Sequence, residues 1–249
     1  MNPWRRTVIS TLACILCASL LMSPAAAQIA TPDLSEITFV NPSFVNDMSA
    51  TPAADATPAV DGEAHGGILG DPDAPVTLRI YADYQCPHCR NFHAIIEPQL
   101  IADYVVPGDI RLEFIDFPVI GIKSVQEWND DGKESVQAAE ATMCAAEQDA
   151  FMLYREALFT GDLKPNSGAL SDENLVRIGD ELGLDADALS ACLASGRYED
   201  AVVSQALAAL DAGVQQTPSM AIDGDIIVLT QDGYDGLRLT LDEAIANSR

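Results

Sequence analysis

The sequence has few basic residues, few histidines and few cysteines. Its 249 residues include 13 Lys and Arg against 38 Asp and Glu, for a formal net charge of -25. Such a surface repels polyanions, so we expect no nucleic-acid partner. Six cysteines are too few for a disulfide-rich scaffold, and three histidines limit any histidine-ligated metal site. The composition, 48% hydrophobic and 20% charged, is that of a globular protein rather than a disordered chain.

The first 27 residues have the three parts of an export signal. Arg5 and Arg6 form a short basic region, residues 7–22 are mostly apolar, and residues 25–27 are all alanine. The apolar stretch is shorter than the roughly 20 residues of a membrane-spanning helix. We therefore predict a signal peptide over residues 1–27 and a periplasmic or other extracytoplasmic location, with membrane anchoring if the signal is not cleaved.

The segment 28–70 is acidic and rich in proline, and it contains no Lys or Arg. A segment of this kind buries too little apolar surface to offset the entropy lost on ordering. We predict that it is a largely flexible linker and that one folded domain occupies residues 71–249.

Hydrophobic periodicity within this domain predicts alternating strands and helices. A strand, a helix and a strand are followed by helices over residues 131–213, and then by two strands and a helix. We therefore expect an α/β fold with the order β-α-β, a helical insertion of about four helices, and β-β-α. The predicted strands are 76–82, 110–114, 219–222 and 226–229. The predicted helices are 87–104 with a kink at Pro98, 131–159 with a possible break near its middle, 171–182, 185–195, 202–212, and a last helix that carries Leu237, Leu241 and Ile245.

The junction of the first strand and helix carries the sequence Cys86-Pro87-His88-Cys89. Unpaired backbone N–H groups and the helix dipole favour a thiolate on Cys86, and His88 would stabilise the same anion. Pro87 suits the first helical position because its missing N–H has no partner there. We predict that Cys86 is the reacting sulfur and Cys89 the resolving one. A lowered thiol pKa stabilises the reduced pair, so the disulfide should be a strong oxidant.

Two alternatives compete with a redox pair at this position. Cys86, Cys89 and His93 have the spacing of zinc ligands, although no fourth ligand is evident. A purely structural disulfide is disfavoured because so short a loop removes little chain entropy. We expect no metal at this site and treat His93 as a partly buried helix residue.

From about residue 71 to the end, the chain resembles the DsbA-like thiol-disulfide oxidoreductases, exported members of the thioredoxin superfamily. The cysteine motif alone would indicate only that superfamily, whereas its combination with Thr217-Pro218 and the helical insertion is more specific. The matching stretches are 83–89, Phe92-His93, Asp116-Phe117-Pro118, 144–148, 192–196 and 213–218.

The resemblance implies that Pro218 is cis and packs against the cysteine pair, with Thr217 offering backbone groups to an extended client chain. One position departs from the family pattern. Many relatives have a buried acid six residues before the first cysteine, where this chain has Ile80. Asp83 would substitute only if it faced inward, and we expect it to be a solvated loop carboxylate.

Cys144 and Cys192 both lie in the helical insertion. In an oxidising compartment, two remaining cysteines of one subdomain are expected to form a disulfide, with two inert thiols as the alternative. The residues one helical turn from Cys144 include Glu140 and Gln148, which indicates a mixed surface rather than a deep core.

These observations predict an exported thiol-disulfide oxidase that introduces disulfides into client proteins by exchange through Cys86 and Cys89. We expect reduced client proteins and a membrane-bound reoxidising protein as its partners, no cofactor beyond the redox-active disulfide, and a monomeric state. The alternatives are a reductase or isomerase of the same fold, and a non-catalytic module that binds a metal or a peptide.

Overall fold

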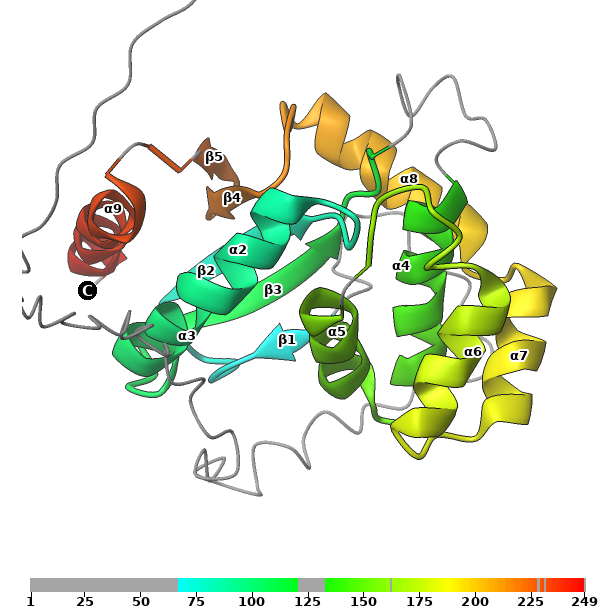
Figure 1. The fold of residues 1–249 in the computed structure, drawn as a ribbon. Helices are drawn as coiled ribbons and strands as arrows, with labels where there is room; N and C mark the ends of the chain where they lie inside the picture. The colour runs from blue at the N-terminus through cyan, green and yellow to red at the C-terminus, as the bar shows by residue number, and fades with distance from the viewer. Residues whose placement is uncertain (1–66, 121–132, 162, 228, 231, 249) are drawn as a thin grey trace, which may run out of the picture. The chain divides into compact units, whose positions relative to one another are not determined.

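The computed structural model describes residues 67–120, 133–161, 163–227, 229–230 and 232–248 (Figure 1). The predicted signal peptide and nearly all of the predicted linker lie outside the described residues. Within these ranges, no helix is long and apolar enough to span a membrane.

Five strands form one mixed sheet in the order β1-β3-β2-β4-β5. The central pair β2 and β3 is parallel, which a helical crossover between them requires. The other neighbours are antiparallel, and β4 and β5 form a hairpin that turns at Asp223 and Gly224. The strands are β1 (Ile68–Leu69), β2 (Val76–Ala82), β3 (Ile110–Asp116), β4 (Ser219–Ile222) and β5 (Asp225–Ile227).

The strand β1 corrects the predicted start of the domain. Ile68 and Leu69 pair with Glu113 and Leu112 of β3 at one edge of the sheet. The predicted linker therefore extends too far, because this segment joins the sheet through its backbone. A strand of two residues is too short to show the alternation of apolar and polar residues from which strands are predicted.

The helices follow the predicted order with two differences. The first helix ends before Pro98 and resumes, so α2, α3 and a π-helical turn replace one kinked helix. The long region 131–159 is divided into α4 and α5, so the described residues of the insertion form five helices instead of about four. The helices are α2 (Pro87–Ile95), α3 (Glu97–Leu100), the π-helix η2 (Ile101–Val105), α4 (Lys133–Ala146), α5 (Phe151–Thr160), α6 (Asp172–Glu181), α7 (Ala186–Ser195), α8 (Glu199–Asp211) and α9 (Gly233–Ser248).

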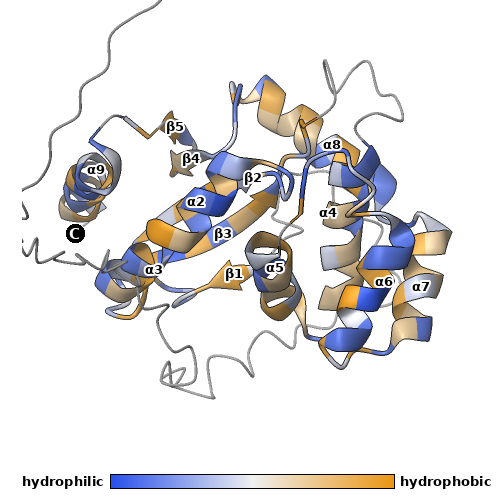
Figure 2. Ribbon diagram, in the orientation of Figure 1, coloured by the Kyte–Doolittle hydropathy of each residue, from blue (hydrophilic) through white to orange (hydrophobic). Residues whose placement is uncertain are grey.

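The two faces of the sheet are covered by different helices. Alternate residues of β2 and β3, among them Leu78 and Leu112, pack with apolar residues of α2, α3 and α9. Residues of the opposite parity, among them Tyr81 and Ile115, pack against α8. Figure 2 shows the apolar character of β3, the strand between β1 and β2. Successive residues of a strand point to opposite faces of the sheet, so the alternation that predicted β2 and β3 also places their side chains alternately in the two cores.

The helical insertion has a core of its own, and the cysteine motif belongs to it. Cys86, Cys89 and Tyr84 cluster with buried residues of α4, α5, α6 and α7. The redox pair therefore lies where the sheet domain meets the insertion, so residues of both subdomains shape its surroundings.

Cys144 of α4 and Cys192 of α7 form a disulfide, as predicted from their compartment and position. Each side chain retains 2% of its exposure, so the prediction of a mixed surface around Cys144 was wrong. Cys144 is buried because α6, α7 and α8 all pack against α4, the helix that carries it.

Replacing Cys144 and Cys192 together by alanine is expected to lower the free energy of unfolding by about 4 kcal/mol. The disulfide closes a loop with a sequence separation of 48 residues, and its loss restores that loop entropy to the unfolded chain. Urea unfolding of the wild type and the double variant measures the difference. An unchanged unfolding midpoint would show that the bond does not constrain the unfolded state.

Candidate active site

Cys86 occupies the predicted position at the amino end of α2. Its backbone is extended and Pro87 begins the helix, so Cys86 is the N-cap residue. The next turn of the helix carries Cys89. The start of a helix concentrates unpaired N–H groups, and this turn is fixed further by the backbone N–H of Cys86, which donates to the carbonyl of Asp83 at 3.0 Å.

The two cysteines differ sharply in acidity. A hydrogen bond from Cys89 lowers the pKa of the Cys86 thiol to about 5, with help from Thr217 and the backbone N–H groups of Cys89 and His88, against the effect of burial. The pKa of Cys89 is raised, first by burial and then by the neighbouring Cys86. In the reduced protein Cys86 is therefore the thiolate and Cys89 the thiol near neutral pH.

Both sulfurs are largely covered by protein. Cys86 retains 3% of its exposure and Cys89 retains 1%, whereas Pro87 and His88 between them are exposed. Pro87 and His88 are therefore the exposed residues of the motif, and the access of a client chain to Cys86 stays a prediction. The contribution of His88 to the thiolate comes from its backbone N–H, and the predicted contribution of its imidazole stays a prediction.

The loop before β4 lies against the cysteine pair, as the resemblance implied. The peptide bond between Thr217 and Pro218 is cis. The Cys86 sulfur lies 3.5 Å from the carbonyl oxygen of Thr217, to which the protonated thiol donates. Thr217 and Pro218 are half-buried, and their binding of a client chain stays a prediction.

Asp83 was predicted to be a solvated loop carboxylate, and this prediction was wrong. Its side chain retains 1% of its exposure, and burial raises its pKa to about 6 against the effect of four hydrogen bonds. It accepts them from the backbone N–H of Gln85 at 2.8 Å and the Ser135 hydroxyl at 2.9 Å, and from the N–H groups of Val119 and Ile120 at 2.7 and 2.8 Å. Asp83 therefore joins the cysteine loop to the end of β3 and the start of α4.

Replacing Asp83 by alanine is expected to lower the free energy of unfolding by at least about 3 kcal/mol, because four donors lose a buried acceptor together. Chemical denaturation of the oxidised protein measures the change. Asp73→Ala is the matched control, since Asp73 lies in an exposed turn. Equal effects of the two substitutions would contradict the assigned role of Asp83.

A buried ionic cluster next to the site was not predicted from the sequence. Arg155 of α5 donates to both carboxylate oxygens of Glu97 at 2.7 and 2.8 Å, and each side chain is about 3% exposed. Its guanidinium lies 3.9 Å from the centre of the Phe114 ring. The opposite charge of Arg155 is the main reason that the pKa of Glu97 falls to about 2 despite its burial. The pair links α5 of the insertion to α3. Glu97 and Arg155 are too far apart in the sequence for the pairing to be predicted from it.

His93 belongs to this cluster rather than to a metal site. Its Nδ1 lies 3.3 Å from Glu97 and its Nε2 lies 2.7 Å from Glu156. Burial opposes protonation, but these carboxylates outweigh it and raise the pKa of His93 to about 9. Both ring nitrogens therefore face carboxylates, which disfavours the zinc alternative. Among the residues that the structure describes, no group of three or more potential ligands is placed to hold a metal ion.

Comparison with known proteins gives a consistent result. A family profile described as thioredoxin matches residues 63–243. A probable disulfide bond formation protein D of Bacillus anthracis is 27% identical over 179 residues, which cover 71% of this chain and 77% of that protein. The oxidised crystal structure of BdbD from Bacillus subtilis superposes with a TM-score of 0.62 and 23% identity, covering 76% of this chain and 96% of that one. Wolbachia pipientis alpha-DsbA1 gives a TM-score of 0.60 and 23% identity, covering 73% and 91%.

Proposed function

This chain belongs to the thioredoxin family and is a DsbA-like thiol-disulfide oxidoreductase, and on that premise we propose that it works as an oxidase of client proteins. The observation that supports this direction is the placement of the Cys86 sulfur at the start of α2, where Cys89, the Thr217 side chain and backbone N–H groups lower its pKa. This environment stabilises the Cys86 thiolate and hence the reduced pair. A disulfide whose reduced form is stabilised gives its oxidising equivalents readily to other thiols.

The proposed reaction begins with the oxidised pair. A client thiolate attacks the Cys86 sulfur, a mixed disulfide forms, and the bond between Cys86 and Cys89 breaks. Cys89 leaves with the electron pair and takes a proton, which agrees with its raised pKa. A second client thiolate then attacks the client sulfur of the mixed disulfide and expels Cys86 as a thiolate. The client loses two electrons and forms a disulfide, and the enzyme gains both electrons.

The order of the two leaving groups follows from attack of the client on Cys86, which expels Cys89 first. Cys86 leaves last, and a thiol of low pKa is a good leaving group. The step that releases the oxidised client is therefore fast. A protein with two ordinary thiols would hold its client longer in the mixed disulfide.

The remaining parts of the proposal concern location and partners. The basic, apolar and alanine-rich parts of residues 1–27 support export, and the four cysteines that follow them are an even number. Each turnover leaves Cys86 and Cys89 reduced, so sustained oxidation requires an external electron acceptor. We propose a membrane-bound reoxidising protein for this role, with reduced, newly exported proteins as the clients.

A direct experiment mixes the oxidised protein, in stoichiometric amount, with a reduced and unfolded client that contains two cysteines. The expected result is transfer of the disulfide, with one client disulfide formed per enzyme disulfide lost. Mass spectrometry after thiol alkylation counts both. Retention of the enzyme disulfide in the presence of excess client thiols would overturn the oxidase assignment.

A further inference from the structure

The connection between α5 and α6 lies against the cysteine motif. We call residues 163–170 the anchored loop, because hydrogen bonds hold it at several points. Gln85, directly before Cys86, accepts from the backbone N–H of Asn166 at 2.6 Å. Arg90, directly after Cys89, donates from Nη2 to the carbonyl of Leu163 at 2.9 Å. The two anchoring side chains therefore flank the redox pair on either side in the sequence.

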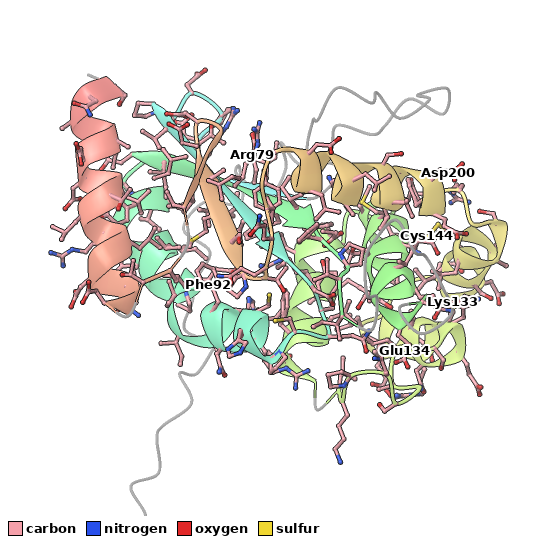
Figure 3. The ribbon with its side chains drawn as sticks, turned by 90° about the horizontal axis from the view of Figure 1, so that it is seen from above. Arg79, Phe92, Lys133, Glu134, Cys144 and Asp200 are labelled. Atoms are coloured by element: carbon pink, nitrogen blue, oxygen red, sulfur yellow. A yellow bond between two sulfur atoms is a disulfide. The ribbon has the colours of Figure 1, made fainter. Side chains whose placement is uncertain are left out.

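The far end of the anchored loop is held by α4. Glu134 accepts from the backbone N–H groups of Gly168 and Leu170 at 2.8 and 3.0 Å. Figure 3 shows Glu134 at the start of α4, next to Lys133. Gln85 also donates to the Ser135 hydroxyl at 2.7 Å, so α4 and the loop share one set of contacts. With both ends fixed, the loop has a defined position relative to Cys86.

This position brings a surface of the insertion to the approach to Cys86. Residues 164–168 are exposed, as are Pro87 and His88. In the sequence, Lys164 directly follows Leu163, which contacts Arg90, and it lies two residues before Asn166, which contacts Gln85. Because each residue spans at most about 3.6 Å, its backbone lies within about 8 Å of both anchoring contacts. Lys164 therefore belongs to the exposed part of a loop that the two residues flanking the redox pair hold in place.

The charge of Lys164 is unusual in this protein. The chain has 38 acidic and 13 basic residues, and Lys164 forms no ion pair with another described residue. Arg90, also beside the motif, adds a second positive charge. On a strongly acidic protein, an exposed positive charge such as that of Lys164 complements a negatively charged residue of a partner.

We propose that the anchored loop forms one wall of the client-binding surface, and that Lys164 favours client segments with an acidic residue next to the reacting cysteine. The inference rests on the proposed function, since it assumes that a client chain docks at Cys86. It names the chemistry of the partner: an extended, acidic polypeptide segment that contains cysteine.

The test uses full-length Cys89→Ala protein, in which Cys86 captures a peptide without resolution. Peptides carry one cysteine bonded to thionitrobenzoate and flanked by Glu, Gln or Lys. The Cys86 thiolate attacks the peptide sulfur, the peptide–thionitrobenzoate bond breaks, and the coloured thionitrobenzoate anion leaves. Its absorbance gives the capture rate. The ratio of the rates for the Glu and Lys peptides is the readout, because changes in the reactivity of Cys86 itself cancel.

At an ionic strength of about 0.15 M, charges more than about 8 Å away are largely screened. We expect a Glu/Lys rate ratio above one, and Lys164→Gln is expected to lower this ratio about two- to fivefold, the range for one exposed charge pair. Lys164→Glu should lower it further. Gln85→Leu, which removes an anchor, should move it in the same direction. Arg238→Gln on α9, in the C-terminal helix on the opposite side from α6, is the control that leaves the ratio unchanged (Figure 1).

Two failures are distinguishable. If all peptides are captured and Lys164→Gln has the wild-type ratio, or the wild-type ratio is one or lower, the inference is overturned and the proposed function stands. If no peptide is captured by any form of the protein, Cys86 is not a reacting thiol and the proposed function is overturned along with the inference.

Discussion

Cys86→Ser is expected to reduce client oxidation to the uncatalysed rate. Serine cannot form a disulfide, and a single remaining Cys89 is buried with a raised pKa, so it is a poor nucleophile and an inaccessible target. Cys89→Ser is expected to fail differently. Its Cys86 still attacks a client whose single cysteine is bonded to thionitrobenzoate, and the mixed disulfide persists because neither the enzyme nor the client has a second thiol to resolve it.

Stopped reactions analysed by non-reducing electrophoresis distinguish the two variants, since only Cys89→Ser should yield the enzyme–client adduct. The protein in which Cys144 and Cys192 are both replaced by alanine is the control for cysteine loss. It should oxidise clients at temperatures where it stays folded, because that disulfide is buried in the insertion. An adduct formed by Cys86→Ser through Cys89 would contradict the assigned order of attack.

The equilibrium with glutathione is expected to shift by a factor on the order of a few hundred toward the reduced enzyme between pH 5 and pH 8. Above the Cys86 pKa of about 5, reduction yields one thiolate and one thiol, so each turnover releases one proton to the solvent. The apparent equilibrium constant then rises about tenfold per pH unit, up to the pKa of the glutathione thiol at about 8.5. Below pH 5 the curve should flatten.

The sign follows from the two states of Cys86. A depressed thiol pKa stabilises the reduced protein above that pKa, and the stabilisation is lost as the pH falls through about 5. At pH 7 the gain over an unperturbed thiol is about 3 kcal/mol, from about 1.36 kcal/mol for each of two pH units. This corresponds to about 60 mV toward oxidising power for a two-electron couple.

Equilibration at a fixed glutathione ratio, followed by acid quenching and alkylation, measures the reduced fraction at each pH. An independent measurement is the ultraviolet absorbance of the thiolate, which should titrate near pH 5 in the reduced protein and disappear in Cys86→Ser. A curve that stays flat up to pH 8 would mean that Cys86 is an ordinary thiol. The protein would then lack the thiolate on which the oxidase proposal depends.

Local sequence was informative wherever one element determines its own structure. The alternation of Val76, Leu78 and Ile80 predicted β2, and the motif from Cys86 to Cys89 predicted the start of α2. The helix predicted to begin at Asp185 does begin there, and the Asp185 side chain accepts from the N–H of Ala188 at 3.0 Å. Each of these features depends on residues within one or two turns, so spacing alone is sufficient evidence.

The prediction for Asp83 failed because the surroundings of this side chain are formed by residues far away in the sequence. Its donors include Val119 and Ile120, which are more than 30 residues away, and Ser135, which is 52 residues away. Without these partners a carboxylate in a loop is expected to face water, because burial of an unpaired charge is costly. Once the end of β3 and the start of α4 converge on it, the same carboxylate lies buried and hydrogen-bonded.

The sequence by itself predicted the order of strands and helices apart from β1, placed Cys86 at the start of a helix, and favoured a disulfide between Cys144 and Cys192 over two inert thiols. These conclusions need only periodicity, the geometry of a helix start and the parity of the cysteines. Only the tertiary structure decided that Asp83 is buried, that Glu97 and Arg155 pair, and that residues 163–170 lie beside Cys86. The physical reason is that burial and charge pairing depend on which distant segments fold together, and a side chain's own sequence neighbours do not encode that distance.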